Sequence, residues 1–154
     1  MTIQLLAGFV VSTINIMMHA LATVAAITIV RAMAFRQWPY PRLHLMGVMV
    51  VTVALLKFTH TLEIFAWALC YWLVGAAPAG TDLIYFAFVN YTTLGYGDVL
   101  PVQEWRLLGP MAAMTGILMF GWSTAVIFDV LVKMLAHLAA VAAPGTTFSA
   151  EGRD

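Results

Sequence analysis

The part of the sequence best suited to chemistry is the run Thr-Thr-Leu-Gly-Tyr-Gly-Asp at residues 92–98. Glycine adopts positive φ angles at little steric cost, so Gly95 and Gly97 allow successive carbonyl groups to point the same way. Closely spaced carbonyl oxygens can replace the water shell of a dehydrated cation, and the hydroxyl of Thr93 adds one more oxygen beneath them. The run therefore predicts cation coordination by backbone oxygens. The expected coordinating residues are Thr93, Leu94, Gly95 and Tyr96.

Such a loop needs supporting elements, and the sequence supplies a short helix before it and a long apolar span after it. Residues 82–91 are too short to cross a bilayer, which takes about 20 apolar residues, so we expect a re-entrant helix there. Thr81 or Asp82 is suited to cap it. The alternative is an ordinary turn, since Gly and Asp are common turn formers, but the setting favours a pore loop. Its aromatic residues could form a collar around the loop: Tyr85, Phe86, Phe88 and Tyr91.

The composition is that of a membrane protein. Of the 154 residues, 63% are hydrophobic and 9% are charged, whereas a soluble domain has about 45–50% apolar and about 25% charged residues. Three apolar stretches are long enough to span a bilayer, at about residues 5–30, 43–74 and 107–138. We therefore expect an all-α integral membrane protein with three transmembrane helices plus the re-entrant helix and loop.

Several other classes of protein are disfavoured by the same composition. The formal net charge is zero, so no nucleic-acid partner is expected. The only cysteine is Cys70, so neither an intrachain disulfide nor a cysteine-based metal motif is possible within the chain. The sequence contains no nucleophile–base pair, phosphate-binding loop or cofactor fingerprint. We expect neither an enzyme nor a cofactor.

The distribution of positive charge predicts the orientation in the membrane. Arg31, Arg36 and Arg42 all lie between the first two spans, and Lys133 and Arg153 lie at or after the end of the third. The positive-inside rule then places this loop and the C-terminus in the cytoplasm. The N-terminus and the entry to residues 92–98 would lie outside. Short cytoplasmic parts favour a prokaryotic plasma membrane.

The chain divides into three regions. Residues 1–42 would form an N-terminal span and cytoplasmic loop, residues 43–138 a pore module, and residues 139–154 a disordered tail with no soluble regulatory domain. No internal repeat is present. One loop per chain therefore predicts a homotetramer within the lipid bilayer, with three identical subunits as partners.

Residues 58–138 resemble the two-span pore module of the potassium channel family, with outer helix, pore helix, filter and inner helix in order. The resemblance is carried by residues 86–98 and supported by Pro101 and Trp105. It implies passive, K⁺-selective conduction. The implied site residues are Thr93, Leu94, Gly95, Tyr96 and Gly97 in the filter, Asp98 at the outer mouth, Tyr85 and Phe86 in the collar, and Gly116, Ile117, Phe120 and Gly121 at the inner-helix hinge and cavity.

The chain also departs from the family pattern. Many members have paired tryptophans where this chain has Tyr85 and Phe86, and some have a glutamate behind the filter where it has Val89. Three spans are too few for a voltage-sensing domain. Two other functions stay open at this stage: a weakly selective cation channel, and a non-conducting membrane subunit that assembles with a partner.

Ionisable residues in the first two spans form a second candidate site. Lys57, His60 and Glu63 follow one another at intervals of three in the second span, and Asn15 and His19 lie in the antiparallel first span. His19 and His60 lie at similar depth, roughly 21 and 22 Å from the outer ends, at about 1.5 Å per residue. Charged groups at this depth are costly and indicate function.

Three hypotheses fit this group of polar residues. They could be contacts that fix the first span to the pore module, or a proton-sensitive gate, since histidine titrates near neutral pH. They could also be a metal site formed by His19, His60 and Glu63, although Lys57 would repel a divalent cation. In the third span, Asp129 either lines an inner vestibule or pairs with Lys133 four residues later.

Overall fold

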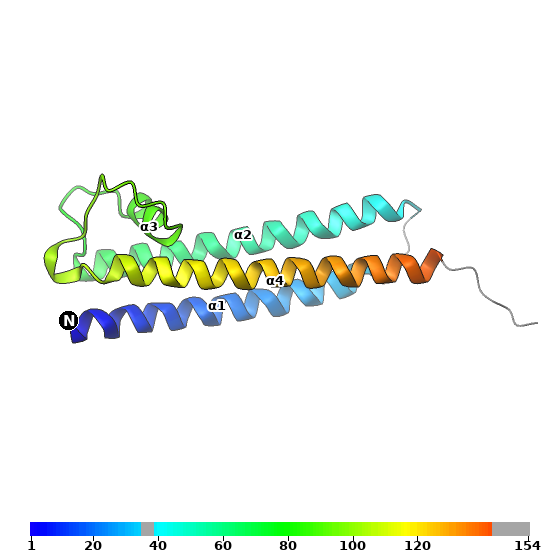
Figure 1. Cartoon of the computed structure of the whole chain (residues 1–154), viewed down its shortest axis with the longest axis horizontal. Helices are drawn as coiled ribbons and strands as arrows, with labels where there is room; N and C mark the ends of the chain where they lie inside the picture. Colours follow the sequence, from blue (N-terminus) through cyan, green and yellow to red (C-terminus); the bar gives the residue numbers. More distant parts are fainter. Residues whose placement is uncertain (35–38, 143–154) are drawn as a thin grey trace, which may run out of the picture.

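The computed structural model describes residues 1–34 and 39–142, and in this part of the chain all regular structure is helical. Three long helices, α1 (Thr2–Ala34), α2 (Pro41–Val74) and α4 (Leu108–Ala142), lie side by side along the molecule (Figure 1). The short helix α3 (Leu83–Tyr91) and its loops lie at one end, together with the 3-10 helix η1 (Gln103–Trp105). The three long helices are apolar enough to cross a membrane. The expected all-α membrane fold is confirmed.

The helix ends follow from local sequence. Proline stands at the start of α2, where its missing N–H costs no hydrogen bond. Gly75 ends α2 in the left-handed conformation at φ 63°, and the N–H of Ala76 donates to the carbonyl of Tyr71 at 2.9 Å. This C-terminal cap turns the chain toward α3. A bond from the N–H of Val102 to the carbonyl of Ala76 (2.9 Å) closes the return path to α4.

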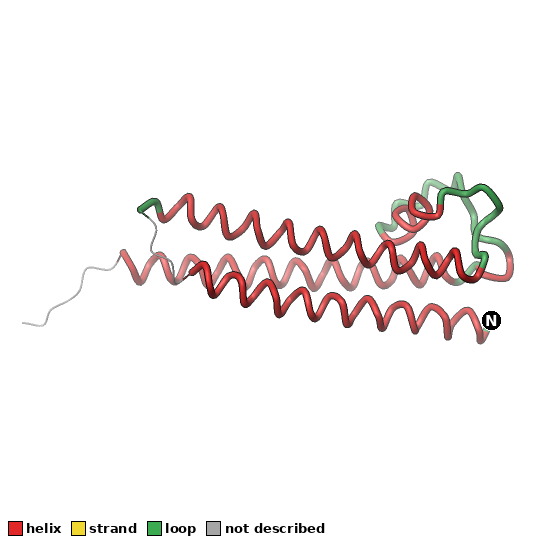
Figure 2. The backbone as a smooth tube through the Cα atoms, turned by 180° about the vertical axis from the view of Figure 1, so that it is seen from behind, coloured by secondary structure: helices red, strands yellow, loops and turns green. Residues whose placement is uncertain are grey.

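The N-terminal helix is an integral part of the bundle, because α1 packs against both α2 and α4. Its N-terminus lies at the same end as α3 and the loops (Figure 2). There the side chain of Gln4 accepts a hydrogen bond from the N–H of Leu107 at 3.1 Å, and Ser12 shares a bond of 2.8 Å with Thr115 on α4. The expected antiparallel arrangement of the first two spans is present.

The C-terminal part of α4 lies at the other end of the bundle and is longer than the sequence predicted. Helix α4 continues to Ala142, so the predicted tail from residue 139 begins too early. The reason is the alanine-rich sequence at this point, because alanine has the highest helix propensity. Residues 143–154 and Arg36 lie outside the described residues.

The larger buried cluster of the core lies at the end that carries α3. Buried aromatic rings join α2 to α3 there, with Tyr71 packed on Trp67 and Phe86 at ring-centre distances of 5.9 and 5.0 Å. A smaller apolar cluster joins the long helices at the opposite end through Val30, Val48, Val130 and Met134. The loop at residues 92–98, called the glycine loop below, thus lies at the end of the molecule that holds the larger buried cluster.

Candidate ion-coordination loop and buried polar cluster

Helix α3 is fixed at both ends by hydrogen bonds. At its start the side chain of Asp82 accepts from the N–H groups of Ile84 and Tyr85 at 3.0 and 3.1 Å, so Asp82 rather than Thr81 is the cap. At its end the carbonyl of Val89 accepts from the N–H groups of Leu94 and Gly95 at 3.0 and 3.4 Å. The beginning of the glycine loop is therefore held on the last turn of the helix.

The backbone of the glycine loop alternates in conformation. Thr93, Gly95 and Gly97 have φ angles of 61°, 57° and 78°, while the residues between them keep negative φ. Alternation between left- and right-handed conformations turns successive carbonyls toward the same side, which a row of coordinating oxygens requires. Sequence reasoning assigned positive φ to the two glycines but missed Thr93. A β-branched residue rarely adopts it, so no local signal pointed there.

The outer end of the loop is tied back to α3. The hydroxyl of Tyr85 donates to a carboxylate oxygen of Asp98 at 2.7 Å. This hydrogen bond is the main reason that the pKa of Tyr85 is raised above its ordinary value. Both residues were predicted site residues, but their bond was not. Val89 is buried and apolar, and the side chain that holds Asp98 is that of Tyr85.

The two predicted collar residues separate in the structure. Phe86 is 2% exposed and packs on Tyr71 in the core, whereas Tyr85 is 37% exposed at the loop. Neighbouring residues of a helix do not face the same way, which is why Phe86 does not join Tyr85 in a collar within one chain. The predicted loop side chains of Leu94 and Tyr96 are exposed in the single chain, at 52% and 68%.

The two glycines of the predicted hinge, Gly116 and Gly121, have different surroundings. A Cβ atom added at Gly116 would collide with the carbonyl oxygen of Tyr91, whereas one added at Gly121 would meet open space. Gly116 therefore provides the close approach of α4 to the end of α3. In the single chain Ile117 is 59% exposed and Phe120 is 36% exposed, and the ring of Phe120 packs on that of Tyr91 at a ring-centre distance of 5.6 Å.

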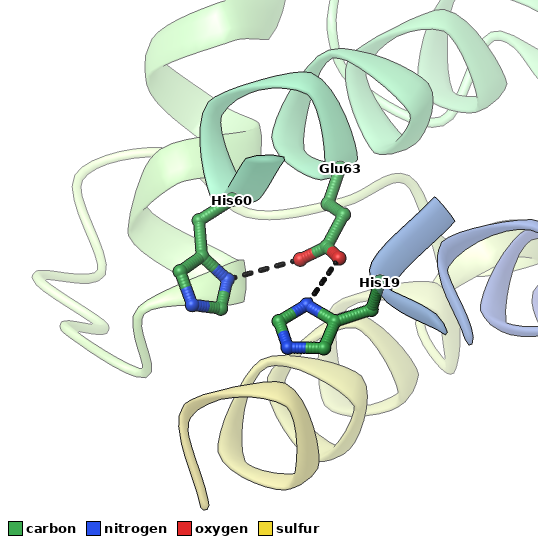
Figure 3. Close-up of side chains that lie close together, drawn as sticks. All are labelled: His19, His60 and Glu63. Atoms are coloured by element: carbon green, nitrogen blue, oxygen red, sulfur yellow. Dashed lines mark hydrogen bonds and ion pairs between the residues drawn. The ribbon is translucent and has the colours of Figure 1, made fainter. Parts of the chain in front are cut away.

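The predicted meeting of α1 and α2 is present and is centred on Glu63 (Figure 3). Its two carboxylate oxygens lie 2.9 Å from Nδ1 of His19 and 3.0 Å from Nδ1 of His60. The side chains of His19 and Glu63 are fully buried, and that of His60 is 13% exposed. Asn15 adds a bond of 3.4 Å from its amide to the backbone carbonyl of Glu63.

Two further residues extend this group to the other helices. The hydroxyl of Tyr91, the last residue of α3, donates to Glu63. The hydroxyl of Ser123 on α4 lies 2.9 Å from Nε2 of His60 and 3.3 Å from Nε2 of His19. We call these residues the buried polar cluster: His19, His60, Glu63, Tyr91 and Ser123.

Sequence reasoning did not include Tyr91 or Ser123 in this group. The one signal for Ser123 was its spacing, since it lies seven residues, or about two turns, after Gly116 and so shares a face of α4 with it.

Lys57 does not belong to the buried polar cluster, contrary to the sequence-based expectation. It is exposed. The six steps along the helix from Lys57 to Glu63 turn it by about 600°, which leaves the two side chains about 120° apart. On α4, Asp129 and Lys133 form an exposed ion pair at 2.5 Å, so the predicted pairing is confirmed.

The geometry at Glu63 is that of hydrogen bonding rather than metal coordination. Ligand atoms of His19, His60 and Glu63 all lie within 4.8 Å of one another, and their chemistry would suit zinc. However, the nitrogen–oxygen separations of 2.9 and 3.0 Å are shorter than the separation of about 3.3 Å between two ligands of a tetrahedral zinc ion. The Nδ1 atoms face the carboxylate as hydrogen-bond donors would.

Comparison with known protein families matches residues 57–133 to the family model described as an ion channel. The match covers half of the chain: the second part of α2, α3, the glycine loop and most of α4. It contains Glu63 and Gly116 and leaves α1 outside. Comparisons with curated proteins and with solved structures give no match. The chain, a multi-pass membrane protein with the loop and helix arrangement described above, therefore belongs to the ion channel family.

Proposed function

We propose that the protein is a potassium-selective channel that conducts K⁺ passively as a homotetramer in the plasma membrane. The observation that carries this proposal is the alternating backbone of the glycine loop, with positive φ at Thr93, Gly95 and Gly97. Four such loops around one axis would surround a dehydrated ion with the carbonyl oxygens of residues 93–96. Several adjacent sites of this kind allow ions to move by mutual repulsion.

Two features at the ends of the glycine loop support cation passage. The C-terminal end of α3, with its partial negative charge, lies directly before the loop and favours a cation beneath it. Asp98 is the last residue of the loop, and four copies would raise the local cation concentration at the mouth.

Assembly into a tetramer is supported by the surface of the single chain. The side chains of Tyr96 in the glycine loop and of Leu100 just after it are both 68% exposed, and Ile117 on α4 is 59% exposed. A single loop supplies only one wall of a coordination site, so the site is complete only when four chains meet. We propose the orientation that the arginines predict, with the N-terminus and the glycine loop outside and the C-terminus in the cytoplasm.

The test is ion flux through the purified protein in liposomes, with K⁺ compared with Na⁺. Gly97→Ala is the informative variant, because φ is 78° there and an added Cβ would meet nothing in its own chain, so the expected effect is strain in the loop backbone. Gly47→Ala is the matched control, since this glycine lies inside α2 and also has open space. We expect flux of K⁺ only, lost in Gly97→Ala and retained in Gly47→Ala.

Other outcomes would redirect the assignment. Equal flux of K⁺ and Na⁺ would make the protein a nonselective cation channel. An absence of flux for both ions, with chemical cross-linking that shows no tetramer, would favour a non-conducting subunit.

A further inference from the structure

We propose that the buried polar cluster is a binding site for a single proton, held by the two imidazoles. The basis is a closed ring of hydrogen bonds that runs from Glu63 to His19, from there to Ser123, then to His60 and back to Glu63. The ring joins α1, α2 and α4, and Tyr91 adds α3. A proton bound here therefore acts on all four α-helices at once.

The ring fixes the number of protons. An ionised carboxylate only accepts, so Nδ1 of His19 and Nδ1 of His60 must both carry hydrogen. Each Nε2 then faces the hydroxyl of Ser123, which has one hydrogen and can donate it to only one of them. The other Nε2 must donate to the hydroxyl oxygen. One of the two imidazoles therefore carries two protons, and three of the four ring nitrogens are protonated.

The charge balance agrees with this count. With one doubly protonated imidazole, the negative charge of Glu63 is cancelled inside the membrane. Two neutral imidazoles would leave one negative charge there, and two charged ones would leave one positive charge; both arrangements are costly in an apolar medium. Three donors converge on the carboxylate of Glu63, from His19, His60 and Tyr91, and such donors favour its ionised form.

The groups that face the cluster come from every helix packed around it. They are His19 and the amide of Asn15 on α1, His60 and Glu63 on α2, Tyr91 on α3, and Ser123 and Trp122 on α4. The ion pairs in the described part of the chain are His19–Glu63, His60–Glu63 and the distant Asp129–Lys133. The counter-charge for Glu63 is accordingly an imidazolium, not a lysine or an arginine.

The proton site is connected to the glycine loop through one residue. The hydroxyl of Tyr91 donates to Glu63. Tyr91 also lies two residues before Thr93, which is the first residue of the glycine loop with positive φ. Its carbonyl group also lies where α4 approaches most closely, at Gly116. Loss of the proton leaves Glu63 unbalanced and breaks one edge of the ring. We expect this change to loosen the support of the loop.

The first test counts protons directly and does not depend on ion conduction. In the His44→Gln/His137→Gln background only His19 and His60 remain, and their ring nitrogens can be labelled with ¹⁵N in lipid-reconstituted protein. At neutral pH we expect NMR signals from three protonated nitrogens and one unprotonated nitrogen, unchanged by a metal chelator. Two or four protonated nitrogens, or a change on chelation, would overturn the proposal.

The second test measures regulation and rests on the proposed function. K⁺ flux in liposomes should fall by at least about five-fold, the lower end of usual coupling between two sites, between neutral pH and the alkaline pH at which the ¹⁵N signals show that the third nitrogen has lost its proton. His19→Gln should remove this dependence on pH, and His137→Gln, an exposed position on α4, should retain it. A pH profile shared by all three proteins would refute the coupling. If no flux is found while NMR still shows three protonated nitrogens, the channel assignment is contradicted and the proton site is not.

Discussion

The glycine loop and the buried polar cluster lie close together and are built in opposite ways. The loop relies on backbone geometry set by consecutive residues, and its side chains at Leu94 and Tyr96 are exposed in the single chain. The cluster relies on five side chains drawn from four helices, with up to 104 residues between bonded partners. Local sequence can specify the first kind of site. The second kind of site forms only when each helix is rotated about its own axis so that these side chains face one another.

This difference can be tested most severely at Glu63. We expect Glu63→Leu to lower the stability by about 3–5 kcal/mol, because it leaves donors from His19, His60 and Tyr91 buried without an acceptor. Thermal unfolding in detergent measures the loss. Glu104→Leu, at an acidic residue exposed in η1, is the control and should change little. Equal effects in the two variants would mean that the cluster contributes no special stability.

The contact between the two regions can be tested at the glycines of α4. Gly116→Ala forces a Cβ against the carbonyl of Tyr91 and should cost about 1–3 kcal/mol, as overpacking does. Gly121→Ala meets open space in the same helix and should stabilise it by about 0.5–1 kcal/mol. The same unfolding measurement compares them. Similar shifts for both variants would contradict the close approach at Gly116.

A titration can show whether the outer end of the loop is held by a side chain. The hydrogen bond to Asp98 raises the pKa of Tyr85 above the ordinary value of a phenol. The bond is therefore fully present at pH values below that ordinary pKa, and it is lost as pH rises through the raised pKa. Ultraviolet difference spectra of the phenolate should show one tyrosine titrating earlier in Asp98→Asn than in the wild type. Identical titration curves would show that the bond does not form.

The smallest effect is expected from the exposed ion pair on α4, and it sharpens the contrast with the buried polar cluster. Asp129 and Lys133 are 48% and 59% exposed, so solvent and salt screen their attraction. A double-mutant cycle with Asp129→Asn and Lys133→Met should give a coupling of about 0.3–0.5 kcal/mol. A coupling as large as that at Glu63 would remove the distinction between exposed and buried charges in this bundle.

Sequence alone predicted the elements and much of the loop. The three long helices, the short helix with a cap at Thr81 or Asp82 and the positive φ of two glycines all follow from apolar length, capping preference and glycine content. The meeting of His19 with Glu63 was also predicted, because depth in the membrane follows from about 1.5 Å per residue. These features depend on position along the chain.

The errors concern rotation about helix axes and backbone strain. Lys57 was placed with Glu63 because Lys57, His60 and Glu63 follow one another at intervals of three, but Lys57 lies on another side of α2. Ser123 was missed because only the packing of α4 turns its hydroxyl toward the two histidines. The φ of 61° at Thr93 could not be inferred from a residue type that avoids it. Such properties are set by tertiary packing rather than by local sequence.

The hydrogen bond between Gln4 and Leu107 has a consequence for the modularity of the channel. The family match begins at residue 57, yet α1 supplies polar partners within the matched segment, at Leu107, Thr115 and Glu63. A fragment that starts at residue 57 would therefore lack the acceptor for the amide of Leu107 and the partner of Glu63 at His19, so we expect deletion of α1 to leave these polar groups without those partners.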